Sequence, residues 1–257
     1  KKKPKSSLVV LGMGKLGAYE LNFSSDIDLI FSYPDMQKGW PSSHISIEEF
    51  HLQIGQQLIR AMDSVTDRGF VYRVDMRLRP YGDSGPLVAS FDAMADYYQL
   101  QGREWERYAM IKARPVAGPK AASRELMELL RPFVYRRYLD FGAFESLRNL
   151  KEQIVREVER KGMQDNIKLG PGGIREAEFI VQSLQLVRGG NDAALQAQQL
   201  QTVLPLLVNS WGLSEEGATG LREAYRFLRR LENFIQAIND RQTHDLPSGD
   251  VDRSRLC

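Results

Sequence analysis

The sequence predicts an α+β fold, in which a small mixed sheet with helices is followed by an α-helical bundle. Apolar runs at 8–11 and 29–31, and an alternating run at 70–79, indicate strands in the first part. From residue 90 onward the patterns are almost exclusively helical. A change of composition near residue 115 divides the chain into a catalytic domain, 1–115, and a helical bundle, 116–257.

The first strand leads into a glycine turn and then a second strand. Residues 15–22 are compatible with a helix, and residues 22–25 are turn-formers. Asp26, Ile27 and Asp28 open the second apolar run. Side chains two apart in a strand share a face, so both carboxylates project together. Neighbouring carboxylates repel unless a cation lies between them, and hard oxygen ligands favour a divalent ion of the magnesium type.

Three interpretations compete for this stretch. The glycines of GMGKLG spell the dinucleotide-binding motif, and Asp35 lies about where a ribose-binding acid is expected. We disfavour it because the segment between the strands is short for a crossover helix and leaves Asp26 and Asp28 without a role. An isolated Asp-x-Asp pair is also commonly a solvated strand edge. The third, a nucleotidyltransferase palm with phosphates held at the glycine turn, predicts another carboxylate on a later strand.

The alternating run at 70–79, FVYRVDMRLR, supplies that carboxylate. One face is apolar, and the other carries Asp75 flanked by arginines. Alone, the run would suggest an ordinary strand with a polar solvent face. Together with Asp26 and Asp28, the three acids and the row of guanidinium groups suit metal-assisted transfer of a nucleotidyl group.

The remaining segments read mainly as helices and turns. Ser46 to Glu49 forms a capping signature before an amphipathic helix, and His44 and His51 read as surface or structural residues. YGDSG at 81–85 reads as a turn or a loop closing over phosphate. Further helices are expected at about 91–101, 104–112, 121–138, 143–161, 173–188, 194–211 and 215–240. On the second of these, Glu104, Arg107 and Lys112 either reach back to the site or form an ordinary helix face.

The charge balance and cysteine content narrow the function classes. Lys+Arg 35 against Asp+Glu 33 gives a net charge of +2, so nucleic acid is not expected as a partner. The one cysteine, Cys257, excludes an internal disulfide and fits a reducing cytoplasm. No apolar run approaches the ~20 residues of a membrane span, so no membrane association is expected.

Five motifs together carry a resemblance to a known family. They are GMGKLGAYELNFSSDIDLIF, YRVDMRLRPYGDSGPLV, WERYAMIKAR, RPFVYRRYLDF and IKLGPGGIREAEFIVQ. The chain resembles the bifunctional glutamine synthetase adenylyltransferase/adenylyl-removing enzymes of bacteria from about residue 8 to at least 247. These enzymes have two related halves. SSDIDLIF, RPYGDSGPLV and LGPGGIREAEF are similar to the N-terminal, adenylyl-removing half, whereas the C-terminal half reads closer to SSDLDLVF, RPSGKAGMLV and DEGGITDIEF.

The resemblance implies a polymerase-beta-like palm and a fragment of a longer bifunctional enzyme, monomeric and cytoplasmic. The implied reaction removes AMP from an adenylylated tyrosine of glutamine synthetase, with inorganic phosphate as nucleophile and ADP as product. Uridylylated PII signalling protein is the implied regulatory partner. The alternatives are ATP-dependent adenylylation of the synthetase, and a non-catalytic nucleotide-sensing or partner-binding module.

The expected active site joins the acids to a set of phosphate ligands. Asp26, Asp28 and Asp75 are the expected catalytic residues and would hold two Mg²⁺ ions. The residues expected to contact phosphate or nucleotide are Gly14, Lys15, Ser25, Arg77, Arg79, Lys168 and Arg175. The last two flank GPGG at 170–173, which cannot be a helix interior, so a helix begins at Ile174.

Overall fold

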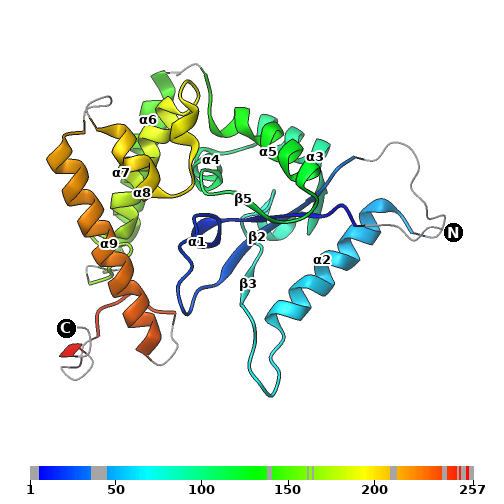
Figure 1. Cartoon of the computed structure of the whole chain (residues 1–257), viewed down its shortest axis with the longest axis horizontal. Coiled ribbons are helices and arrows are strands. Elements are labelled where there is room, and N and C mark those ends of the chain that lie inside the picture. Colours follow the sequence, from blue (N-terminus) through cyan, green and yellow to red (C-terminus); the bar gives the residue numbers. More distant parts are fainter. Residues whose placement is uncertain are drawn as a thin grey trace. The chain divides into compact units, whose positions relative to one another are not determined.

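The structure is a computed structural model, and its contacts divide the chain into two compact units (Figure 1). Unit 1 comprises Lys1–Glu20 and Asp26–Val134, and unit 2 comprises Leu21–Ser25 and Tyr135–Cys257. The residues that the structure describes are 6–35, 45–137, 141–160, 162–163, 165–208, 213–238, 242–247, 249 and 253–254. Each unit has a hydrophobic core of its own.

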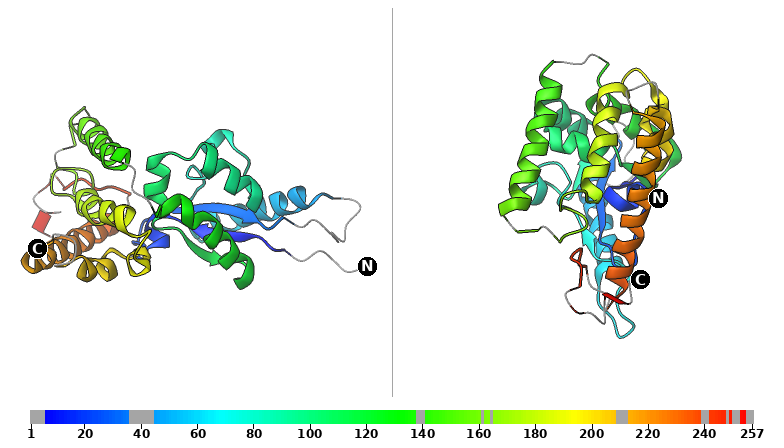
Figure 2. Two further views of the ribbon diagram at one scale, coloured as in Figure 1. Left: turned by 90° about the horizontal axis from the view of Figure 1, so that it is seen from above. Right: turned by 90° about the vertical axis from the view of Figure 1, so that its left-hand side faces the viewer.

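Unit 1 is built on a small mixed sheet. Its strands are β1 (Val9–Gly12), β2 (Ile27–Tyr33), β3 (Val74–Asp75), β4 (Val88–Ser90) and β5 (Arg114–Ala117). β1 lies antiparallel between β2 and β5, as the ribbon views show (Figures 1 and 2). The other edge of β2 is shared by two parallel partners, β3 at its start and β4 at its end. This mixed sheet confirms the predicted α+β class.

The helices of unit 1 lie between these strands in the chain, except the last helix, which follows β5. They are α1 (Gly14–Gly17), α2 (Ile47–Asp63), the short 3₁₀ helix η1 (Gly82–Ser84), α3 (Phe91–Leu100), α4 (Glu104–Met110) and α5 (Lys120–Val134). α2 begins as predicted, because the Ser46 hydroxyl accepts the Glu49 N–H at 3.0 Å. A Cβ on Gly55 would lie 2.9 Å from Phe31 and 3.3 Å from Val88, so α2 lies directly on the sheet.

His51 fixes α2 to the same face of β2. Its ring stacks on Tyr33 with centroids 4.6 Å apart, and its relative exposure is 0%. Nδ1 lies 2.8 Å from the Ile47 carbonyl oxygen, and Nε2 lies 3.3 Å from the Ser7 backbone nitrogen. The neutral Nδ1–H tautomer satisfies both contacts. His51 is therefore structural, and His44 lies outside the described residues.

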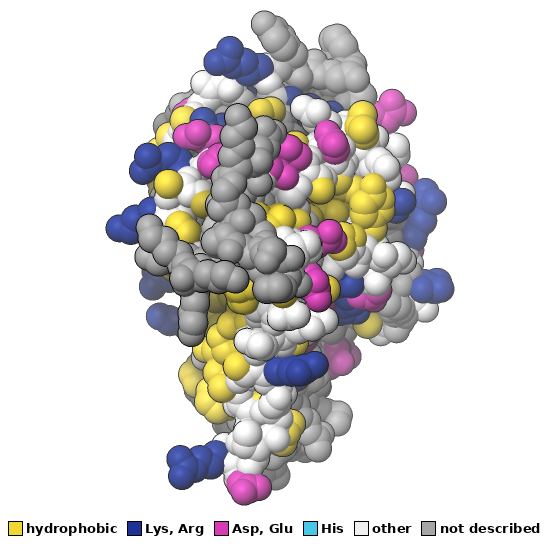
Figure 3. All heavy atoms as spheres, turned by 90° about the vertical axis from the view of Figure 1, so that its right-hand side faces the viewer, with side chains coloured by type: hydrophobic (Ala, Val, Ile, Leu, Met, Phe, Trp, Pro, Cys, Tyr) yellow, Lys and Arg dark blue, Asp and Glu magenta, His cyan; other side chains and the backbone are white. Residues whose placement is uncertain are grey.

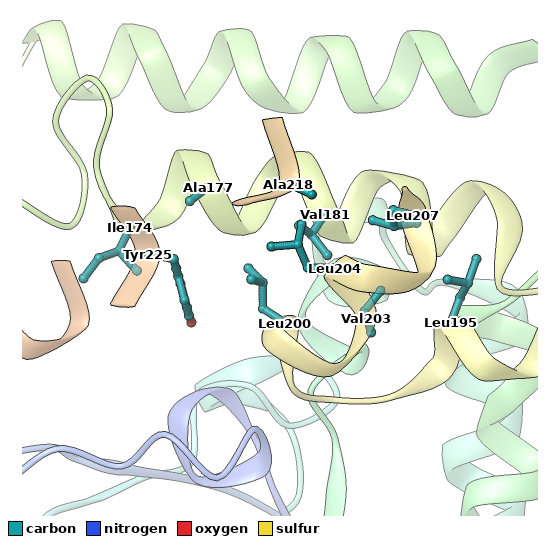
Figure 4. Packing of buried hydrophobic residues seen from close by; sticks show 10 residues of the cluster. All are labelled: Ile174, Ala177, Val181, Leu195, Leu200, Val203, Leu204, Leu207, Ala218 and Tyr225. Atoms are coloured by element: carbon teal, nitrogen blue, oxygen red, sulfur yellow. The ribbon is translucent and has the colours of Figure 1, made fainter. Parts of the chain in front are cut away.

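Unit 2 is helical. It contains α6 (Phe141–Arg160), α7 (Ile174–Arg188), η2 (Ala193–Gln196), α8 (Leu200–Val203), η3 (Leu204–Leu207) and α9 (Glu215–Ala237). Side chains from α7 to α9 interdigitate in its core (Figure 4). The core includes Val181, Leu204 and Tyr225, each fully buried. In the described part of the chain, no helix has both the length and the apolar character needed to cross a membrane.

Two sequence expectations are wrong in extent. The strand expected at 70–79 contains only Val74–Asp75, because the Val71 and Tyr72 N–H groups donate to the Met62 carbonyl and a turn follows Met76. The helix expected at 194–211 is instead three short helices. Pro205 has no backbone N–H to donate within a helix, and the Leu195 carbonyl accepts a hydrogen bond from the Gln185 side-chain amide at 2.6 Å.

Candidate active site

The parallel pairing of β2 with β3 places two of the predicted carboxylates side by side. Asp28 lies opposite Asp75, and Ile27 lies opposite Val74. Neighbouring strands lie about 4.8 Å apart, and paired residues project from the same face. Because Ile27 and Phe31 share the face of β2 that α2 covers, Asp26 and Asp28 project from the opposite face.

The glycine turn after β1 lies against this carboxylate row. Gly14 has φ +50°, and a Cβ there would lie 2.9 Å from Asp28 Oδ2. Any side chain at Gly14 would therefore be strained and would press on the Asp28 carboxylate. The Met13 N–H donates to the Asp28 carbonyl at 2.9 Å, which joins the turn to β2. The sequence predicted this juxtaposition of the turn and the acids.

Asp26 and Asp75 are each paired with an arginine. Arg73 Nε donates to Asp26 Oδ1 at 2.7 Å. Arg77 forms a bidentate pair with Asp75, with Nε 3.1 Å from Oδ1 and Nη2 2.5 Å from Oδ2, and the Arg77 backbone N–H also donates to Oδ1 at 2.8 Å. These contacts hold the pKa of Asp75 below its ordinary value, chiefly through the Arg77 side-chain hydrogen bond. Asp75 likewise raises the pKa of Arg77, and Asp83 and Asp28 act on Arg77 in the same direction.

The other predicted phosphate ligands of this region occupy different settings. Arg79 is only 12% exposed, and its Nη1 contacts the Met76 carbonyl at 2.8 Å and Asp83 at 3.5 Å. Arg79 therefore stabilises the turn that contains η1 through these contacts. Lys15 is a half-buried residue of α1, and buried Ser25 directly precedes Asp26 in the chain.

Lys168 and Arg175 belong to unit 2. The Arg175 N–H donates to the Lys168 carbonyl at 2.9 Å, and α7 begins at Ile174 after the glycine turn, as predicted. Arg175 also lines a cavity of about 210 Å³ with Lys151 and Phe179. Their contact with phosphate remains a prediction.

The sequence analysis missed Arg114, whose side chain donates to the carbonyl groups at the end of α1. Arg114 of β5 donates to the Leu16 carbonyl at 2.8 Å and to the Gly17 carbonyl at 3.0 Å, and its guanidinium lies 3.7 Å from the centre of the Tyr19 ring. These carbonyls end α1, so Arg114 is its C-terminal cap. Its position at the end of WERYAMIKAR was the available signal, but β5 itself was not expected.

The charged residues considered on α4 and after it are structural. Arg107 is 1% exposed and donates to the Val134 carbonyl at 2.9 Å and to Glu104 at 3.2 Å. Lys112 forms an ion pair with Glu20 at 3.6 Å. These contacts favour the ordinary structural interpretation for Arg107.

The geometry rejects the dinucleotide-binding interpretation. β1 and β2 are antiparallel, whereas a dinucleotide-binding unit joins parallel strands through a long helix, and α1 has only 4 residues. Asp35, the proposed ribose ligand, accepts the Asp92 N–H at 2.7 Å at the start of α3. It therefore caps a helix.

The donor set is suitable for a divalent ion of the magnesium type. Asp28 and Asp75 are neighbours in register, Asp26 shares their face, and the missing side chain of Gly14 lets the Asp28 carboxylate lie against the turn. In the structure Asp26 and Asp75 turn to their arginines, and no three acidic, histidine or cysteine side chains among the described residues are arranged to hold a metal. Loading would require the exposed Arg77 side chain to leave Asp75.

A small mixed sheet with a glycine turn beside paired aspartates defines a nucleotidyltransferase domain. The family model for glutamate-ammonia ligase adenylyltransferase matches residues 1–129, and the model for GlnD PII-uridylyltransferase matches residues 148–257. The chain belongs to the glutamate-ammonia ligase adenylyltransferase family.

Three relatives are named bifunctional glutamine synthetase adenylyltransferase/adenylyl-removing enzyme. Those of Nitrosococcus oceani and Pseudomonas putida are each 59% identical over 251 residues, covering 97% of this chain and 26% of the relative. That of Pseudomonas syringae pv. tomato is 58% identical over 250 residues, covering 97% of this chain and 25% of the relative. The chain thus spans about a quarter of the length of these relatives.

Proposed function

We propose that this domain removes AMP from the adenylylated tyrosine of glutamine synthetase by phosphorolysis, giving ADP and the unmodified synthetase. The observation that carries the proposal is the pairing of Asp28 with Asp75 on neighbouring strands, with the glycine turn at Gly14 lying against Asp28. The names of the relatives support glutamine synthetase as the substrate. The motifs SSDIDLIF, RPYGDSGPLV and LGPGGIREAEF favour adenylyl removal over adenylylation.

The reaction is an in-line displacement at the AMP phosphorus. An oxygen of inorganic phosphate forms the new P–O bond, the bond to the tyrosine oxygen breaks, and the phenolate takes a proton from water. Because tyrosinate is a good leaving group, the reaction demands no strong general acid. Mg²⁺ held by Asp26, Asp28 and Asp75 would supply positive charge against the phosphoryl oxygens.

The chain's own residues then position and neutralise the phosphates. Because Gly14 has no side chain, the Asp28 carboxylate lies close to the backbone of the turn, and a phosphate could approach that backbone equally closely. Arg77 is an exposed cation paired with Asp75, and when released from Asp75 it could bind an attacking phosphate bidentately. Lys15, Lys168 and Arg175 are proposed as further phosphate ligands.

The deciding experiment incubates the chain with adenylylated glutamine synthetase and Mg²⁺, with and without phosphate, and identifies the released nucleotide by chromatography. We expect ADP only when phosphate is present. Asp28→Asn should lower turnover by about a thousandfold or more while leaving the melting temperature unchanged, because it removes a metal ligand. Asp67→Asn, in an exposed turn, is the matched control. Near-normal turnover in Asp28→Asn would overturn the metal assignment.

ATP-dependent adenylylation is the second candidate, because the relatives' names include both activities. A parallel incubation with ATP and unmodified synthetase separates the two directions. Pyrophosphate release with a newly labelled synthetase would favour this reaction. Regulation by uridylylated PII and magnesium as the resident ion belong to the same proposal, and adding PII to each incubation tests the former.

A further inference from the structure

A fully buried carboxylate in unit 2 holds the segment from which the catalytic strand starts. Glu232, on α9, is 0% exposed. Its Oε2 accepts hydrogen bonds from Asn22 Nδ2 and from Arg229 Nη1, each at 2.7 Å. Its Oε1 lies 3.1 Å from His244 Nδ1. A carboxylate removed from water is stable only with such partners.

Asn22 belongs to the segment Leu21–Ser25, which packs in unit 2 although it lies between two parts of unit 1 in the chain. Asn22 Nδ2 also lies 3.2 Å from Gln236 Oε1, and the Phe23 N–H donates to Asn233 Oδ1 at 3.0 Å. α9 therefore binds this segment through a side-chain amide and a backbone N–H. Asp26 follows the segment directly, and β2 begins one residue later.

The same carboxylate reaches the second motif expected at the site. The His244 carbonyl accepts the Ile167 N–H at 2.9 Å, and Ile167 in turn accepts the Ile174 N–H at 3.0 Å. These bonds connect His244 to the loop that carries Lys168 and starts α7. Within unit 2, Glu232 thus contacts both the segment Leu21–Ser25 and His244, the residue bonded to the base of the glycine-rich loop.

Apolar residues of similar volume fill a core as well as a buried ion pair does, so packing alone gives no reason for a charge at this point. What a charge adds is a fixed geometry for the polar segments bound to it. We infer that Glu232 is a positioning residue, which acts through Asn22 to fix where the strand carrying Asp26 and Asp28 begins. The effects on turnover and on metal affinity rest on the proposed function, whereas the effect on the order of the segment does not.

Asn22→Ala is the sharpest test, because it removes the link and leaves Glu232 with Arg229 and His244. We expect hydrogen exchange of the backbone amides at 22–30 to accelerate about tenfold or more, and Mn²⁺, the probe for the metal site, to bind about tenfold more weakly. In the synthetase assay kcat should fall about tenfold or more with KM within about twofold, since positioning is lost but substrate contacts stay.

Two further variants separate positioning from folding. The double variant Arg229→Met with Glu232→Met removes both charges of the pair together, so neither is left buried and unpaired. It should reproduce the Asn22→Ala effects, with exchange around Val181 in the interior of α7 unchanged. Glu232→Gln keeps an acceptor for Asn22 and should lose less than Glu232→Ala. Glu223→Ala, on an exposed position of α9, is the matched control and should behave like the unmodified chain.

Unchanged exchange at 22–30 and unchanged Mn²⁺ affinity in a folded Asn22→Ala chain would overturn the inference. If Asn22→Ala fails to fold, the same two measurements on the double methionine variant decide it. If the unmodified chain releases no nucleotide in any incubation, the proposed function fails, and hydrogen exchange at 22–30 still decides the role of Glu232.

Discussion

Two adjacent tyrosines of α3 differ in what their hydroxyl groups meet. Tyr97 donates to Glu106 Oε1 at 2.7 Å, and Glu106 is itself buried. The Tyr98 hydroxyl is buried without a hydrogen-bond partner among the described residues. Burial raises the pKa of both phenols, that of Tyr98 well above its ordinary value. The buried hydroxyl of Tyr97 therefore stabilises the fold through its hydrogen bond, whereas the buried hydroxyl of Tyr98 has a desolvation cost that no hydrogen bond within the described part of the chain offsets.

This contrast predicts opposite effects for the same substitution. Tyr98→Phe removes an unsatisfied hydroxyl and should raise the free energy of unfolding by about 1 kcal/mol. Tyr97→Phe leaves a buried carboxylate oxygen without its donor and should lower it by about 1–3 kcal/mol. Urea denaturation of the two variants, each the other's control, measures the difference. Equal destabilisation by both would contradict the assigned hydrogen bonds.

Gly17 illustrates a position where even one methyl group is excluded. A Cβ there would lie 1.8 Å from the Lys112 carbonyl oxygen and 2.6 Å from that of Gly12. Gly17→Ala should therefore lower the free energy of unfolding by about 3 kcal/mol, since backbone atoms cannot move aside. Gly220→Ala, in α9 with nothing within 4 Å, should instead stabilise the chain by about 0.5–1 kcal/mol. Thermal melts of both distinguish steric exclusion from a general intolerance of alanine.

At the scale of elements, local signals were predictable and long-range pairings were not. The Ser46 cap and the helix after it follow from residues three and four apart, and the paired face of Asp26 and Asp28 follows from strand periodicity. The sequence could not show that β3 lies parallel beside β2, because strand order depends on contacts 47 residues apart, such as that between Arg73 and Asp26. For the same reason the sequence could not show that β5 pairs with β1 or that Arg114 of β5 donates to the carbonyl groups at the end of α1.

The contact of α2 with the sheet should weaken in acid. Burial lowers the pKa of His51 from its ordinary 6.5, outweighing the raising effect of its bond to Ile47. A lowered folded-state pKa gives stability that is present above pH 6.5 and is lost as the pH falls through the folded value. Protonation of Nε2 also removes the acceptor for the Ser7 N–H.

We therefore expect the urea midpoint to fall between about pH 7 and pH 5, with a smaller slope in His51→Gln. The slope is compared within each protein, so the lost stacking on Tyr33 does not affect it. An identical slope in both proteins would show that other groups cause the acid destabilisation.

At the scale of the whole molecule, the contacts are concentrated in two units. Figure 3 shows Lys and Arg side chains interspersed with Asp and Glu on one face, in agreement with the net charge of +2. Each unit buries its own core, and the segment Leu21–Ser25 belongs to unit 2 while its neighbours in sequence belong to unit 1. A ligand that binds one unit should therefore stabilise it selectively, with the exception of this segment.

Magnesium provides the test of that selectivity. An ion at one hundred times its dissociation constant stabilises the state that binds it by about 2.7 kcal/mol. Hydrogen exchange should slow in β2, β3 and the turn at Gly14, and by covalent connection in Leu21–Ser25, while the α7 and α8 core is unchanged. Asp28→Asn should abolish the effect and Asp67→Asn should preserve it. Uniform slowing across both units would instead show that the ion acts on the chain as a whole, because the carboxylate row belongs to unit 1 and the core around Val181 to unit 2.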